Sequence, residues 1–131
     1  MTQEKLLSQH PLANGLTLEF WDLSRHVAGD RWQVVVRARV IMPVNQETIP
    51  PELGERLPEV VSALGSELAF VKDEVRNFID AREKDRLSHQ LQEQLLSSLK
   101  TYLGHPEFAQ RLIRRKFAEY QEKSRWYQET G

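Results

Sequence analysis

The stretch DRWQVVVRARVIMP, residues 30–43, decides the fold because its side chains fall into two alternating sets. Read with a period of two, one set is Trp32, Val34, Val36, Ala38, Val40 and Met42. The other set is Arg31, Gln33, Val35, Arg37, Arg39 and Ile41. Alternation of this kind is typical of a strand with one buried and one solvated face. We therefore predict a strand that buries its even-numbered side chains and turns its arginines outward.

A second alternating run precedes this strand. It is LTLEFWDLSR, residues 16–25, and the segment HVAGD with its Gly-Asp turn signal separates it from the first. Two such runs joined by a short polar connection predict a β-hairpin. Residues 1–15 end in the turn dipeptide Asn14-Gly15 and show no sustained period, so we expect a loose leader there.

The middle of the chain is less regular. Four prolines between residues 43 and 58 predict a connecting loop, with a helical turn near PPEL and a short helix from Pro58 to Gly65. Residues 67–79 fit a helix as well as a strand. Because Gly65 and Asp80 bracket this segment, and because a lone hairpin needs a third strand or a covering helix, we favour the strand.

Two amphipathic helices are predicted in the last third. Asp80 and Glu83 have the spacing of a capping box, and leucines then recur every three or four positions up to Gly104. A second apolar stripe begins after Pro106 and runs to about residue 124, so residues 125–131 are expected to fray. The short link between the helices predicts an antiparallel pair.

These elements predict an α+β fold in the order β-β-α-β-α-α. The predicted architecture is a small antiparallel sheet, made of the hairpin and a third strand, packed on the C-terminal antiparallel pair of long helices. A chain of 131 residues suits a single domain over residues 1–131.

Composition narrows the class of protein. A net charge of -1 excludes the strongly basic nucleic-acid binders as a class. The absence of cysteine excludes disulfides, thiolate nucleophiles and cysteine-based zinc sites, and we expect a cytoplasmic protein. No apolar run reaches the length of a signal-peptide core or a membrane span, so we expect no membrane partner.

Two groups of residues could carry chemistry. One surrounds the hairpin turn: Asp22, Ser24, Arg25, His26 and Asp30. Neighbours on an exposed turn seldom align as a nucleophile, base and orienting acid, so we interpret this group as a polar loop, with a metal site as the alternative. The other group is Asp85, His89 and Glu93, four positions apart, which we interpret as i,i+4 helix support rather than a metal row. We assign no catalytic residue, cofactor or metal, and no phosphate-binding or zinc signature is present.

The solvated face of the hairpin is the sharper feature. Trp21 lies on the same predicted face as Val35, Arg37, Arg39 and Ile41. Exposed tryptophan, arginine and aliphatic side chains together are typical of protein interfaces. We predict a non-enzymatic protein that binds a protein partner, including a second copy of itself, through these five residues. The alternative is that the leader, the proline loop or Trp126-Tyr127 of the tail covers the face.

Two alternatives stay open. Single-stranded nucleic acid would be held by Arg37 and Arg39 together with Arg111, Arg114 and Arg115 of the last helix. The second alternative is an enzyme whose cleft lies between the sheet and the helices and has no local motif.

Overall fold

The computed structural model of the protein describes residues 4–130. It confirms the α+β class and the predicted order of elements. The chain forms two compact units: the first runs to Val40 and resumes over Phe70–His105, and the second comprises Ile41–Ala69 and the chain from Pro106 onward. Both units are therefore built from two separate chain segments, and the single-domain organisation stays a prediction.

The strands are β1 Lys5–Pro11, β2 Thr17–Asp22, β3 Arg25–Ala28, β4 Arg31–Pro43 and β5 Glu67–Asp80. The helices are η1 Pro51–Arg56, which is a 3₁₀ helix, and α1 Leu57–Leu64, α2 Lys84–Leu103 and α3 Phe108–Thr130.

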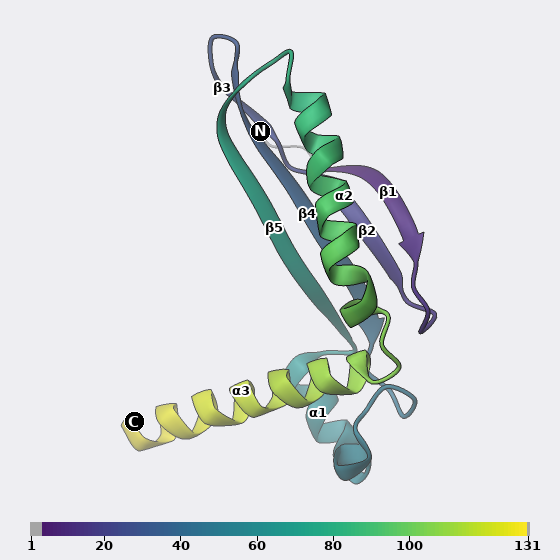
Figure 1. Cartoon of the computed structure of the whole chain (residues 1–131). Helices are drawn as coiled ribbons and strands as arrows, with labels where there is room; N and C mark the ends of the chain where they lie inside the picture. Colours follow the sequence, from purple (N-terminus) through teal and green to yellow (C-terminus); the bar gives the residue numbers. More distant parts are fainter. Residues whose placement is uncertain (1–3, 131) are drawn as a thin grey trace. The chain divides into compact units, whose positions relative to one another are not determined.

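The central strand of the sheet is β4 (Figure 1). Glu19 of β2 lies opposite Arg39, and Arg25 of β3 lies opposite Gln33, so β2 and β3 follow one another along the same edge of β4 in one register. Together, β2 and β3 take the place of the single hairpin strand that was predicted to pair with β4. Most of the HVAGD segment, which was predicted as the connection, belongs to β3. β1 pairs with β2, and β5 pairs with β4.

The predicted loose leader is wrong for residues 5–11, which form β1. Its register against β2 shifts between Leu6 and Ser8. This bulge breaks the period of two, which explains why the alternation is not visible in the sequence. Residues 1–3 lie outside the described part of the chain.

The core of the first unit confirms the predicted burial of the even-numbered residues of β4 from Val34 onward, whereas Trp32 is only half-buried. The even-numbered residues Val34, Val36 and Val40 are fully buried, as are Leu18 and Phe20 of β2. Helix α2 lies over this face of the sheet (Figure 1) and buries a leucine stripe, which consists of Leu91, Leu95, Leu99 and Leu103. Burial of the two apolar surfaces together is what holds the helix against the sheet.

The end of α2 is tied to the β1–β2 turn. The Asn14 amide donates to the backbone carbonyl of Leu103 over 2.8 Å and to that of His105 over 3.1 Å. The Leu103 carbonyl is in the last turn of α2 and the His105 carbonyl follows it; both lack helical partners, so the side chain of a turn residue satisfies them.

The ambiguous segment is a strand, as favoured. Arg37 bonds to Asp73 and Gln33 bonds to Asn77, which places odd-numbered residues of β4 opposite odd-numbered residues of β5. The Ala81 N–H donates to the Asp30 carbonyl over 2.8 Å, one residue out of that register. Phe78 lies between, with a φ of 58°, so the shift is a bulge built on a left-handed residue.

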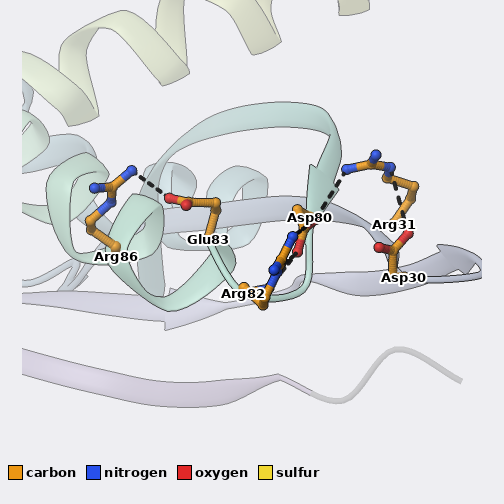
Figure 2. Close-up of polar contacts among 6 residues, drawn as sticks. All are labelled: Asp30, Arg31, Asp80, Arg82, Glu83 and Arg86. Atoms are coloured by element: carbon orange, nitrogen blue, oxygen red, sulfur yellow. Dashed lines mark hydrogen bonds and ion pairs between the residues drawn. The ribbon is translucent and has the colours of Figure 1, made fainter.

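The predicted capping box at Asp80 and Glu83 is wrong. Asp80 accepts the backbone N–H of Arg82 over 2.8 Å, and α2 begins only at Lys84, without a side-chain cap. Figure 2 shows the reason: Arg82 and Arg31 both reach the Asp80 carboxylate, while Glu83 turns to Arg86. The hydrogen bonds from Arg82 lower the pKa of Asp80.

In the second unit, α3 packs against α1. The buried residues of α3 are Phe108, Leu112, Ile113 and Phe117, and Val60 of α1 is buried as well. The helix continues to Thr130, beyond the predicted end at about residue 124, and the fraying of residues 125–131 stays a prediction. Good helix formers, namely glutamate, glutamine, lysine and arginine, are frequent in its second half. Since α2 and α3 belong to different units, their antiparallel pairing stays a prediction.

Candidate functional site on the outer face of the sheet

The face of the first-unit sheet opposite α2 gathers most of the predicted contact residues. The pairing of Arg37 with Asp73 shows that odd-numbered residues of β5 share this face with odd-numbered residues of β4. Trp21 joins them because it lies opposite Arg37, and Leu6 joins because it lies opposite Trp21. The term outer face is used below for Leu6, Glu19, Trp21, Gln33, Val35, Arg37, Arg39, Val71, Asp73, Val75 and Asn77.

Trp21, Arg39 and Glu19 form one cluster on the outer face. The Arg39 guanidinium carbon lies 4.4 Å from the centre of the Trp21 ring, a cation–π distance. The Glu19 carboxylate accepts from Arg39 Nε and from Trp21 Nε1, each over 3.2 Å. Only 23% of the Arg39 side chain and 19% of the Glu19 side chain are exposed. The arginine is therefore both neutralised by its partner and held over the ring.

Arg37 is bound from two directions. Its Nε and Nη2 donate to the two oxygens of Asp73 over 2.8 and 3.0 Å, and its Nη1 lies 3.6 Å from Glu4. The hydrogen bond to Asp73 raises the pKa of Arg37. A bidentate pair fixes the guanidinium plane as well as its charge, so Arg37 ties β4 to β5 across the outer face.

Aliphatic side chains occupy the rest of the outer face. Val71, Val75 and Leu6 are exposed by 46%, 41% and 41%. Val35, which was predicted as a contact residue, is only 8% exposed. The register of β4 and β5 places Val75 opposite Val35, so the exposed Val75 side chain lies beside the buried Val35 side chain. An apolar surface therefore borders the two arginine clusters.

The remaining predicted residues lie in the second unit. Ile41 is 44% exposed and continues the odd-numbered side of β4. Arg111 pairs with Glu107 over 3.1 Å, Arg114 pairs with Glu52, and Arg115 is exposed on the same helix, α3. The structure thus brings Trp21, Val35, Arg37 and Arg39 to one face and leaves the other arginines on a separate element.

Sequence reasoning missed Leu6, Val71, Asp73 and Val75. The alternation of the last three is visible in residues 71–79, but it does not tell which face of the sheet the strand shares or which residue of β4 each one meets. Only the tertiary structure therefore shows which acidic residues neutralise Arg37.

A second candidate is an open groove of about 280 Å³ between β1 and α2, lined by Ser8, His10, His89, Gln92, Glu93 and Leu96. Ser8 Oγ donates to Gln92 Oε1 over 3.0 Å, and His10 Nε2 lies 3.2 Å from Ser8 Oγ. Since the serine proton is directed to Gln92, His10 is the donor in its contact and does not activate the serine as a base would. His89 pairs with Glu93 over 3.2 Å along α2, as i,i+4 support predicts.

The polar residues of the hairpin have structural roles. Asp22 accepts the backbone N–H of Ser24 over 2.8 Å, and Ser24 Oγ accepts the N–H of Val35 over 3.0 Å, where β2 gives way to β3. His26 packs edge-on against Trp32 at 5.6 Å. Within residues 4–130, no three side chains of the metal-binding types gather in a way that could hold an ion.

Comparison with known proteins adds no family. No protein-family model, curated protein or solved structure matches the chain. In the described part of the chain, no helix has both the length and the apolar character needed to cross a membrane.

Proposed function

We propose that this chain works by protein–protein contact and that the outer face is the surface that binds the partner. The observation that carries the proposal is the exposed aliphatic group Leu6, Val71 and Val75 around the Trp21–Arg39 stack. Burying these side chains against another apolar surface is favourable by roughly 25 cal/mol for each Å² removed from water. The cytoplasmic location stays a prediction.

The charges of the outer face define the partner's chemistry. Arg37 and Arg39 already have carboxylate partners, so the face presents planar guanidinium groups and aliphatic side chains rather than unpaired positive charge. Such a face fits an apolar protein surface with hydrogen-bond acceptors at its rim.

The same pairing disfavours the nucleic-acid alternative. Phosphate binding draws its affinity from unpaired lysine and arginine, whereas Arg37, Arg39, Arg111 and Arg114 each contact a carboxylate. The enzyme alternative has no observation in its favour, since the serine of the groove is not activated.

The test combines Trp21→Ala with Arg39→Ala. Partners captured by the wild-type chain should be lost by this double variant, because both halves of the stack are removed. Gln90→Ala, at an exposed position of α2, is the matched control and should keep every partner. A double variant that folds as judged by circular dichroism and retains the same partners would overturn the proposal.

A further inference from the structure

The outer edge of β5 is the strongest feature that the proposed function does not use. β5 has 14 residues and pairs with β4 on one side, and no strand pairs with its other side within residues 4–130. In Figure 1 it is the outermost strand beside β4. Long unpaired edges are sites where another chain can add a strand.

The hydrogen bonds of β4 show which groups of β5 are available. The Val35 carbonyl accepts from Leu23 and its N–H donates to Ser24, so Val35 directs both backbone groups away from β5. Backbone groups alternate in direction along a strand, and odd-numbered residues of the two strands lie opposite each other. Val75 and the other odd-numbered residues of β5 before the bulge at Phe78 therefore direct their N–H and C=O groups to the open edge.

A contact of Arg76 agrees with this direction. Its Nη1 donates to the Val75 carbonyl over 2.9 Å, which a side chain can do only if that carbonyl is accessible at the edge. The same nitrogen lies 3.2 Å from Glu74. The arginine thus occupies a backbone acceptor that a neighbouring strand would use.

We propose that this edge pairs with the β5 edge of a second copy of the chain, antiparallel, about a twofold axis at Val75. Residues whose numbers add up to 150 are then opposite each other. Glu74 meets Arg76 of the other copy twice. Val75 meets its own equivalent, and Asp73 meets Asn77. Every charged pair among the central residues is attractive or neutral.

Neighbouring registers are worse. An axis at Glu74 places the two Glu74 carboxylates opposite each other and sets Lys72 against Arg76, which gives three repulsive pairs. An axis at Asp73 places the two Asp73 carboxylates together. Shifts by a single residue between these registers would set outward-pointing backbone groups against inward-pointing ones. Of these neighbouring registers, the charge sequence of β5 therefore favours the one centred at Val75, which alone combines two attractive pairs with no repulsive one.

The dimer is independent of the proposed function, because it uses the edge and leaves the outer face uncovered. The twofold axis stands perpendicular to the sheet, so the outer faces of both copies lie on the same side and form one continuous surface. A failure of either proposal can be recognised separately. Trp21→Ala with Arg39→Ala should not change the dimer, and the charge variants of Glu74 and Arg76 described below leave Trp21 and Arg39 in place.

The first experiment measures mass by analytical ultracentrifugation. The wild-type chain should sediment as a dimer, and Glu74→Arg or Arg76→Glu alone should reduce it to a monomer, because each places like charges opposite each other twice. The double exchange, Glu74→Arg with Arg76→Glu, should restore the dimer. Mixing the two single variants should also give a dimer, since every pair in the mixed species is attractive. A wild-type monomer, or single variants that remain dimeric, would overturn the proposal.

The second experiment uses the absence of cysteine in the chain. Val75→Cys should form an intermolecular disulfide under mild oxidation, because the two equivalents of residue 75 face each other at about 5.5 Å between Cα atoms. Val71→Cys, equally exposed on the same strand, should not, because its two equivalents are eight residues apart, about 27 Å. Equal crosslinking at both positions would contradict the register and indicate nonspecific association or face-to-face contact.

Discussion

Phe78 shows how a single residue shapes this sheet. It has a φ of 58° and is 73% exposed, although neither a left-handed backbone nor exposure suits phenylalanine. The residue lies where β5 shifts by one position against β4, before Asp80 reaches Arg31 and Arg82. Left-handed backbone costs an L-residue roughly 1–2 kcal/mol, so the surrounding pairing of β4 and β5 holds the strain.

The strain predicts an unusual effect of glycine within a strand. Phe78→Gly should be more stable than Phe78→Ala by about 1 kcal/mol, because glycine adopts positive φ without a Cβ clash. Urea unfolding of both variants at one pH measures the difference. Alanine equal to or more stable than glycine would mean that residue 78 is not held in the left-handed region.

At the scale of elements, the fold rests on the contact between α2 and the even-numbered face of β4. The stripe from Leu91 to Leu103 and the valines of β4 bury one another, while the opposite side of β4 carries Arg37 and Arg39. The two faces differ because alternation in a strand sends neighbouring side chains in opposite directions. The outer face is thus a consequence of how the inner face is buried.

A core variant tests this contact. Leu95→Ala should lower the free energy of unfolding by about 2–5 kcal/mol, because it removes buried methyl groups and leaves a cavity. Its exposed neighbour Gln94 is the matched control, and Gln94→Ala should change stability by less than about 0.5 kcal/mol. Denaturant titrations compare the two. Similar losses for both would mean that α2 does not turn its leucine stripe to the sheet.

At the scale of the whole molecule, charge is balanced locally as well as in total. The net charge is -1. Arg37 and Arg39 of the outer face reach carboxylates of neighbouring strands, and Arg114 of α3 reaches Glu52 of η1. Potential that could steer a polyanion needs unpaired charge of one sign gathered on one surface. Arginines that are paired with carboxylates in this way suit a surface that binds a protein rather than a polyanion.

This balance predicts weak interaction with nucleic acid. Fluorescence anisotropy of a labelled single-stranded oligonucleotide should stay unchanged on addition of the chain at physiological salt. Repeating the titration at lower salt is the control for electrostatic attraction alone. Binding whose affinity falls steeply as salt rises would instead support the alternative based on Arg37, Arg39 and the arginines of α3.

The sequence by itself determined the elements with a clear local period: β4, the hairpin partner and the two long helices. For residues 67–79 the local period fits a helix as well as a strand, and the residues that bracket the segment favoured the strand. The sequence also determined which side of β4 is buried, because the period of two sorts Val34 and Val36 from Arg37 and Arg39. Such patterns are local, since each depends on residues within a few positions of one another.

Only the tertiary structure decided that residues 5–11 form a strand, that Asp73 meets Arg37 and that β5 has an open edge. Strand register is a pairing between distant segments, and several registers bury the same apolar residues. The bulges at Leu6 and Phe78 shift that pairing without a local signal. The physical reason is that hydrogen bonds and ion pairs between strands depend on alignment in space, which the order of residues within one strand does not contain.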